Sequence, residues 1–221
     1  MPNPTLSEQL LEYQAGFKDK VPAAIQAEMA KATAELAATG IDQQSLAVGA
    51  KAPDFALPDA TGKTVRLSEL LAKGPVVINF YRGEWCPYCN LELRAFQLLQ
   101  SEFEAAGAQI VAISPELPDH SLSVTEKHEL AYPVLSDVGN KVSREYGLVF
   151  ALAEALRPIY LSFGLDIPTS NGDDSYTLPL PATYVIDTQG VVRYAFADAD
   201  YTKRAEPSDA LAAVKALAVA A

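Results

Sequence analysis

The first forty residues carry apolar side chains at intervals of three and four, which is the period of an α-helix. Two such stripes follow one another: Leu6, Leu10, Tyr13 and Phe17, then Ile25, Met29, Ala32 and Leu36. A capping-box pattern at residues 5–8 marks the start of the first helix, Pro22 fits the first turn of the second, and Gly40 fits its end. These helices pack either on the rest of the chain or on a second copy, since amphipathicity alone does not choose between the two.

From about residue 46 the pattern changes to short apolar runs that alternate with helical segments. Continuous apolar runs at 76–81 and 110–113 are typical of strands buried on both faces of a sheet, and a helical pattern to about residue 106 lies between them. Further strands are predicted at 55–57, 64–67 and 133–135, a hairpin at 183–194, and helices at 119–129, 140–146 and 209–219. We therefore predict an α/β domain at 46–221 behind a helical extension at 1–45.

Residues 150–179 are less regular. A helix is predicted at 151–160 with Pro158 interrupting it, and residues 168–174 are rich in turn formers. The acidic residues of that turn do not have the ligand spacing of an EF-hand, so we interpret it as a solvated loop.

Composition narrows the classes of function. The chain has 221 residues, enough for one domain with its own core, and a formal net charge of −11, which disfavours binding to the phosphates of nucleic acids. No apolar run approaches the length of a membrane span, and the amino terminus has no signal-peptide pattern. We therefore expect a cytoplasmic protein that contacts neither nucleic acid nor membrane.

The strongest chemical signal is Cys86-Pro87-Tyr88-Cys89, which holds both cysteines of the chain. The motif follows a predicted strand and opens a predicted helix, as in thioredoxin-like redox proteins. Unpaired N–H groups and the positive end of the helix dipole stabilise a thiolate there, and the second thiol is near enough to close a disulfide. The motif indicates a thiol redox catalyst.

Other interpretations of this cysteine pair are weaker. A zinc site needs two more ligands, and the spacing of His120 and His128 fits no common zinc motif. A purely structural disulfide would close a very short loop and add little stability. Two inert buried cysteines remain an alternative. We expect no metal and no cofactor, and we expect both histidines in surface or capping positions.

Several motifs resemble the peroxiredoxins, which are the alkyl hydroperoxide reductase and thiol-specific antioxidant branch of the thioredoxin superfamily. They are Ala52-Pro53-Asp54-Phe55, Gly62-Lys63, Asn79-Phe80-Tyr81 and Tyr184-Val185-Ile186-Asp187. The resemblance covers about residues 46–215 and implies a thioredoxin-like fold, a central mixed β-sheet flanked by helices. Residues 81–89 resemble a peroxiredoxin-like subgroup with Cys-x-x-Cys.

The active-site register departs from the family pattern. The family's proline, threonine and peroxidatic cysteine fall on Arg82, Cys86 and Cys89. The position that usually holds an arginine before the late strand is Pro181. That proline resembles the cis-proline that lies against the cysteine pair in thioredoxins, so the resemblance implies a cis bond before Pro181.

The resemblance implies a thiol peroxidase that reduces hydrogen peroxide or organic hydroperoxides. The sulfenic acid would condense to a Cys86–Cys89 disulfide, which a thioredoxin- or glutaredoxin-like donor would reduce. Arg82 is the candidate to bind the peroxide oxygens and hold the thiolate, unless it only pairs with Glu84 at the surface. Trp85 is expected on the substrate-facing surface, where Tyr88 shapes access and Pro181 adjoins the cysteines.

Two questions stay open on the sequence alone. The family register favours Cys89 for attack on peroxide, whereas Cys-x-x-Cys chemistry favours Cys86, above all for attack on a partner's disulfide. The second hypothesis is accordingly a thiol–disulfide oxidoreductase that acts on protein disulfides, and a non-catalytic redox-sensing module ranks third.

Overall fold

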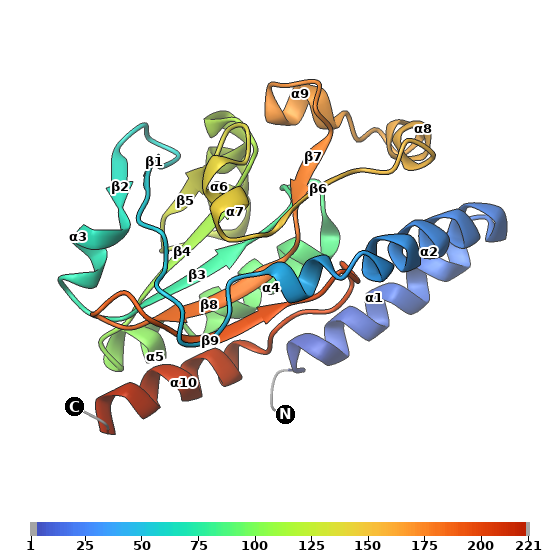
Figure 1. Ribbon diagram of the computed structural model, residues 1–221. Helices are drawn as coiled ribbons and strands as arrows, with labels where there is room; N and C mark the ends of the chain where they lie inside the picture. Colours follow the sequence, from blue (N-terminus) through green and yellow to red (C-terminus); the bar gives the residue numbers. More distant parts are fainter. Residues whose placement is uncertain (1–3, 220–221) are drawn as a thin grey trace.

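The computed structural model describes residues 4–219, and a five-stranded sheet forms its centre (Figure 1). The strand order is β5-β4-β3-β8-β9. The bounds are β3 (Val76–Phe80), β4 (Gln109–Ser114), β5 (Val134–Ser136), β8 (Ala182–Ile186) and β9 (Val192–Ala197). Strands β3, β4 and β5 are parallel, whereas β8 runs antiparallel to both β3 and β9. The mixed sheet confirms the predicted α/β, thioredoxin-like architecture.

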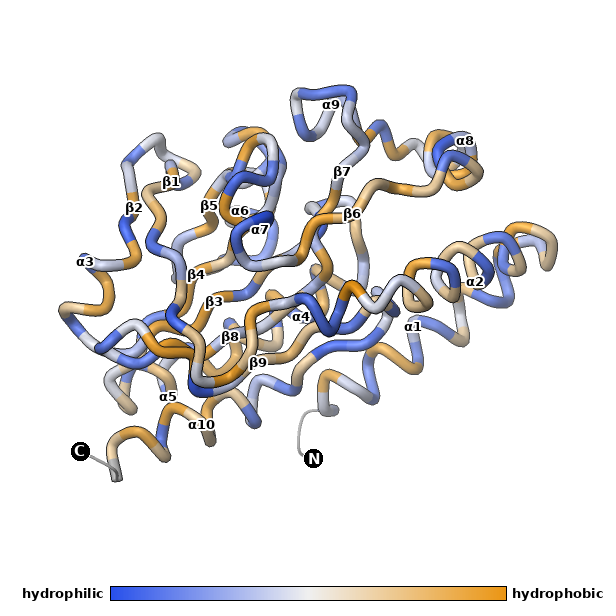
Figure 2. Tube along the Cα trace, in the orientation of Figure 1, coloured by the Kyte–Doolittle hydropathy of each residue, from blue (hydrophilic) through white to orange (hydrophobic). Residues whose placement is uncertain are grey.

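The sheet is buried on both faces, which explains the continuous apolar runs (Figure 2). Along β3, Val77 packs toward one layer while Val76 and Ile78 pack toward the other. The first layer includes α1 (Leu6–Lys20), α4 (Pro87–Leu98), α5 (Gln100–Ala105), α6 (Pro118–His128) and α10 (Pro207–Val219). The second includes the hairpin β1 (Ala56–Pro58) and β2 (Thr64–Arg66) with α3 (Leu67–Leu71) and α7 (Lys141–Glu145).

The amino-terminal stripes pack on the chain itself. Leu6 and Leu10 of α1 belong to the core cluster that contains the cysteines, and Met29 and Ala32 of α2 (Ala23–Ala38) pack with α8 (Leu156–Ser162). The predicted capping box is present at the start of α1, and Gly40 follows α2 with φ of 68° before the 3₁₀ turn η1 (Ile41–Gln44). The first of the two packing alternatives is therefore confirmed, while the boundary at residue 45 stays a prediction.

The structure corrects the predictions for two segments. The helix expected to run on to residue 106 ends at Leu98, and a second helix, α5, follows it. Phe96 of the first helix packs on Phe103 of the second, with ring centroids 5.9 Å apart. The helix expected at 151–160 is wrong at its start, because β6 (Val149–Ala151) pairs with β7 (Thr177–Pro179) and α8 begins only at Leu156. The loop expected at 168–174 contains α9 (Ile167–Asn171), capped by the side chain of Asp166.

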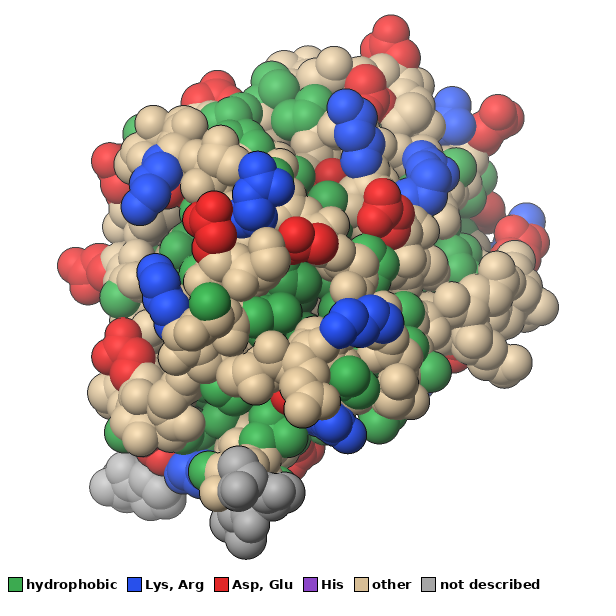
Figure 3. All heavy atoms as spheres, turned by 60° about the vertical axis from the view of Figure 1, so that its left-hand side comes forward, with side chains coloured by type: hydrophobic (Ala, Val, Ile, Leu, Met, Phe, Trp, Pro, Cys, Tyr) green, Lys and Arg blue, Asp and Glu red, His purple; other side chains and the backbone are tan. Residues whose placement is uncertain are grey.

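Acidic and basic side chains are interspersed on the face shown in Figure 3.

Within residues 4–219, no helix has both the length and the hydropathy needed to cross a membrane.

Candidate active site

The two cysteines lie at the start of α4, shortly after the end of β3. The strand ends at Phe80, a short loop follows, and Cys86 is the N-cap of α4 with Pro87 as the first helical residue. Proline suits that position, because the N–H that it lacks would have had no partner inside the helix. Cys89 lies in the first turn, both side chains are fully buried, and neither forms a disulfide. The predicted strand–turn–helix setting of the motif is therefore confirmed.

A buried arginine contacts the first cysteine. The Nη2 atom of Arg82 donates to the Sγ atom of Cys86 over 3.4 Å, and Nη1 donates to the hydroxyl of Tyr160 over 3.1 Å. The guanidinium lies 4.2 Å from the ring centroid of Tyr201 and 5.1 Å from that of Trp85. Arg82 is only 4% exposed. The alternative of a surface pair between Arg82 and Glu84 is wrong, since Glu84 pairs with His120 instead.

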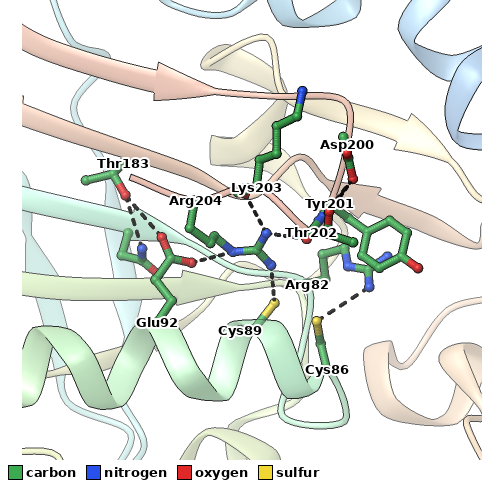
Figure 4. A network of polar contacts seen from close by, with 11 residues as sticks. Arg82, Cys86, Cys89, Glu92, Thr183, Asp200, Tyr201, Thr202, Lys203 and Arg204 are labelled. Carbon is green, nitrogen blue, oxygen red and sulfur yellow. Dashed lines mark hydrogen bonds and ion pairs between the residues drawn. The ribbon is translucent and has the colours of Figure 1, made fainter. Parts of the chain in front are cut away.

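A second buried arginine contacts the second cysteine, and the sequence reasoning missed it. The Nη2 atom of Arg204 donates to the Sγ atom of Cys89 over 3.3 Å, and its Nε atom lies 2.7 Å from Oε2 of Glu92 (Figure 4). Its Nη1 atom donates to the backbone carbonyls of Tyr201 and Lys203, which fixes the plane of the group. Arg204 lies in the loop after β9, and no local motif marks it in the sequence.

Glu92 connects this arginine to the sheet. Its Oε1 atom accepts from the hydroxyl of Thr183 on β8 over 3.4 Å, and that hydroxyl accepts from the amide of Asn79 on β3 over 3.3 Å. Burial raises the pKa of Glu92 to about 7, although the neighbouring Arg204 lowers it. The carboxyl group therefore titrates near neutrality, beside the cysteine pair.

The two thiols have opposite acidities. Burial alone would raise the pKa of Cys86, but the hydrogen bond from Cys89 and the charges of Arg82 and Arg204 outweigh it and hold this pKa well below its usual range. Burial, together with the hydrogen bond to Cys86, raises the pKa of Cys89 well above its usual range. Cys86 is therefore the more acidic thiol of the pair and the one favoured as the thiolate.

The predicted substrate-facing aromatics lie around this pair. The indole of Trp85 packs edge-on against Tyr160, with ring centroids 5.7 Å apart. A Cβ at Gly83 would overlap this indole and would come within 2.8 Å of a carboxylate oxygen of Glu116, so glycine there lets Trp85 pack over the loop. Tyr88 is almost fully buried between the rings of Tyr13 and Tyr201, and its ring centroid lies 5.1 Å from that of Tyr13.

Pro181 lies with Arg82 in the lining of a cavity of about 230 Å³, together with Tyr160 and Tyr201. The implied cis bond before Pro181 is wrong, because no cis peptide bond occurs among residues 4–219. The chain passes from β7 into β8 through only two residues and makes no tight turn, the setting in which cis-prolines are typically used.

Within residues 4–219, neither histidine is hydrogen-bonded to Cys86 or Cys89. The Nδ1 atom of His120 is 2.8 Å from Oε1 of Glu84, and His128 is the last residue of α6. Beside the first pair, the buried carboxylate of Glu116 accepts the backbone N–H of Glu84 over 2.7 Å, and burial raises the pKa of Glu116 to about 8. Nowhere in residues 4–219 do three or more His, Cys, Asp or Glu side chains form a group that could hold a metal.

Comparison with known proteins decides the family. The family model described as AhpC/TSA family matches residues 48–195, which is most of the chain and includes both cysteines. This chain belongs to the AhpC/TSA family. The match begins after α2, so the amino-terminal helices lie outside it.

The relatives of this AhpC/TSA family member include peroxiredoxins of plants and bacteria. The chloroplastic peroxiredoxin Q of Triticum aestivum is 34% identical over 160 residues, which cover 72% of this chain and 63% of that protein. The chain thus spans less than two thirds of the length of that relative. The crystal structure of peroxidoxin BcpB from Mycobacterium tuberculosis superposes with a TM-score of 0.61 at 29% identity, covering 77% of this chain and 97% of that one. A peroxiredoxin Q structure from Xanthomonas campestris, at 23% identity and a TM-score of 0.56, covers 73% of this chain and 90% of that one and supports the fold.

In this AhpC/TSA family member each cysteine sulfur has its own guanidinium donor. A guanidinium stays protonated at any physiological pH and offers several N–H donors in a fixed plane, which suits it to an anionic sulfur and to oxygens that gain charge. The arrangement can therefore hold a thiolate in a buried site and stabilise the negative charge that moves from the sulfur onto an oxygen atom during reaction.

Proposed function

We propose that this chain is a thiol-dependent peroxidase that reduces hydroperoxides through the Cys86–Cys89 pair. The observation that carries the proposal is that, at the start of α4, Arg82 donates a hydrogen bond to the buried sulfur of Cys86 and Arg204 donates one to that of Cys89. Family membership and the peroxiredoxin relatives support it. The full burial of both sulfurs also favours a small oxidant, since a disulfide on the surface of a folded protein cannot touch either one without movement.

Cys86 is the attacking residue in this proposal. It caps the helix, it has the lowered pKa, and its arginine partner lines the cavity, whereas the Arg204 partner of Cys89 does not. The family register favours Cys89 instead, so the two criteria disagree. We give the charge distribution more weight, because the thiolate and not the thiol is the nucleophile.

The reaction balances with the groups present. The Cys86 thiolate attacks the terminal oxygen of the hydroperoxide, the O–O bond breaks, and the products are a Cys86 sulfenic acid and an alkoxide that takes a proton from the solvent to become the alcohol. Cys89 then attacks the sulfenic sulfur, the S–O bond breaks, and hydroxide leaves with the Cys89 proton as water. The Cys86–Cys89 disulfide and one alcohol remain.

Arg82 has two tasks in this scheme. Its Nη2 atom holds the thiolate before attack, and the guanidinium offers N–H donors toward the peroxide oxygens as charge moves onto them. The aromatic rings of Tyr201 and Trp85 hold the group in place.

A thioredoxin- or glutaredoxin-like dithiol would reduce the disulfide and close the cycle. Because neither cysteine is exposed in the reduced protein, the start of α4 must move before such a donor can reach the disulfide. The cytoplasmic location and a homodimer stay predictions.

Trp85 provides the experiment, because it is the only tryptophan and its ring lies 5.1 Å from the Arg82 guanidinium. Fully reduced protein is mixed with hydrogen peroxide, and separately with cumene hydroperoxide, in a stopped-flow fluorimeter. We expect the protein to be oxidised at least about a hundredfold faster than a free thiol, because stabilisation of the thiolate and of the charge in the transition state both speed up the reaction. Mass spectrometry should then find one intramolecular disulfide.

Oxidation no faster than that of a free thiol would overturn the peroxidase proposal. Activity would then be sought with disulfide substrates. A Cys89→Ser variant that traps mixed disulfides with disulfide-containing partner proteins would support the oxidoreductase alternative.

A further inference from the structure

A cavity of about 230 Å³ adjoins the catalytic arginine, and the amino-terminal extension forms one of its walls. Ala32 and Leu36 of α2 line it from one side, while Leu152, Leu156 and Leu180 line it from the main domain. Its lining is therefore mainly apolar where it is buried. The exposed residues Glu35, Thr39 and Ala151 also belong to the lining, which places the mouth of the cavity between the end of α2 and β6.

Arg82 is the one charged group in the buried part of this lining. Its side chain contacts Cys86 through Nη2 and Tyr160 through Nη1, whereas its Nε atom is buried and has no hydrogen-bond partner among the described residues. A buried guanidinium N–H without a partner is costly, so an oxygen-bearing ligand at this point would gain a hydrogen bond. Cys86 itself does not line the cavity, but the guanidinium at the polar end of the cavity is the group that contacts its sulfur.

The size of the cavity limits its occupant. An apolar cavity of about 150 Å³ is sufficient to bind benzene. The cavity here has room for one aromatic ring or a branched alkyl group of similar size, together with a hydroperoxyl group. Hydrogen peroxide would leave most of the apolar lining without contacts.

Charge at the mouth disfavours anionic substrates. Glu35 is exposed there, its only ion pair within residues 4–219 is a 3.9 Å contact to the equally exposed Lys31, and the whole chain carries a net charge of −11. A carboxylate-bearing hydroperoxide would meet this charge as it enters, so a neutral one is favoured.

We propose that α2 is a substrate-specificity element and that this cavity binds the organic group of neutral, compact, apolar hydroperoxides. The inference rests on the proposed peroxidase function and deepens it. The organic group lies against Ala32 and Leu36, and the hydroperoxyl group points to Arg82 and Cys86. Since the family match begins at residue 48, this wall is built by a segment that the matched region does not include.

The test fills the cavity from α2. Ala32→Leu adds three carbon atoms to a buried lining residue, and Ala24→Leu makes the same change at an exposed position of the same helix that does not belong to the lining of this cavity. The ratio of kcat/KM for cumene hydroperoxide to kcat/KM for hydrogen peroxide should exceed one in the wild type. It should fall about tenfold or more in Ala32→Leu, and it should match the wild type in Ala24→Leu.

A binding measurement keeps the inference falsifiable if Ala32→Leu folds poorly or if no peroxide is reduced. The probe is 2-phenyl-2-propanol, the unreactive alcohol that cumene hydroperoxide leaves behind, titrated into reduced wild-type protein while Trp85 fluorescence is followed. Saturable binding that Ala24→Leu retains supports the cavity assignment. A wild type that does not bind the alcohol, or a ratio that is unchanged in well-folded Ala32→Leu, overturns it. Loss of all peroxide reduction with intact alcohol binding would instead overturn the peroxidase function.

Discussion

The Nη2 atom of Arg204 lies 3.3 Å from the Sγ atom of Cys89, although 115 residues separate the two along the chain. Arg82 makes the corresponding contact to Cys86 over 3.4 Å. Two buried cations thus contact the cysteine pair, one at each sulfur, and Arg204 also pairs with the carboxyl group of Glu92. Oxidation to a disulfide removes the negative charge from the sulfurs, so the arrangement stabilises the reduced protein more than the oxidised one.

The first prediction concerns Arg82. Arg82→Gln removes the cation beside Cys86, so the pKa of that thiol should rise and the thiolate fraction at pH 7 should fall. Since a hydrogen bond to a charged group contributes about 1.5–3 kcal/mol, oxidation by peroxide should slow by roughly 10- to 150-fold. Arg94→Gln, an exposed change on the same helix, is the control. The pH profile of alkylation of Cys86 reports the pKa directly, and an unshifted profile would contradict the role of Arg82.

The second prediction assigns the cysteines. In Cys89→Ser the Cys86 thiolate should still react with one equivalent of peroxide, because Arg82 and Arg204 still lower its pKa and the serine hydroxyl is also a hydrogen-bond donor. The product should be a sulfenic acid that dimedone traps. Cys86→Ser should lose the fast phase altogether. If the fast phase survives in Cys86→Ser and disappears in Cys89→Ser, then Cys89 is the peroxidatic residue and the family register was the better guide.

The third prediction concerns the buried pair of Arg204 and Glu92. Arg204→Met leaves a buried carboxyl group without its cation, and the loss of one partner of a buried pair costs about 3–5 kcal/mol in the free energy of unfolding. The matched change Arg193→Met breaks a pair in which the arginine is 45% exposed, and it should cost about 1 kcal/mol or less. Urea denaturation of both variants measures the difference. An equal loss of unfolding free energy in the two variants would mean that the Arg204–Glu92 pair contributes no more to stability than the exposed pair.

The fourth prediction concerns pH. Burial raises the pKa of Glu116 to about 8 in the folded chain, above its usual value near 4.5. The folded protein therefore keeps a proton that the unfolded chain has released, so the stabilisation is complete below pH 4.5 and is lost as the pH rises to about 8. Glu84, His120 and Cys86 are the ionisable neighbours that act on the same group.

Glu116→Gln keeps the acceptor for the Glu84 N–H and removes this titration. The free energy of unfolding of the wild type should fall, relative to that of the variant, by roughly 2–4 kcal/mol between pH 5 and pH 9. Glu126→Gln, an exposed change on α6, serves as the control and should follow the wild type. Parallel stability curves for the wild type and Glu116→Gln would show that the carboxyl group is not protonated at neutral pH.

Local patterns were enough for much of the scaffold. The capping box and stripe of α1, the apolar runs of β3 and β4, and the placement of Cys86 at the head of a helix depend on residues a few positions apart. Where the pattern was weak, long-range pairing decided the outcome. Strand β6 exists because it pairs with β7, some 26 residues later, and nothing near residue 150 signals that partner.

The sequence by itself determined the kind of chemistry, since two cysteines in a Cys-x-x-Cys motif after a buried strand admit few other uses. Arg82 was also within reach of sequence reasoning, because it lies four residues before Cys86. Only the tertiary structure could add Arg204 and the wall that α2 gives to the cavity, and only it showed that the Pro181 bond is trans. The physical reason is that burial and charge compensation act across space. Packing brings the loop residue Arg204 to Cys89 and brings α2 to the cavity beside Arg82, and the distances along the chain do not reveal either contact.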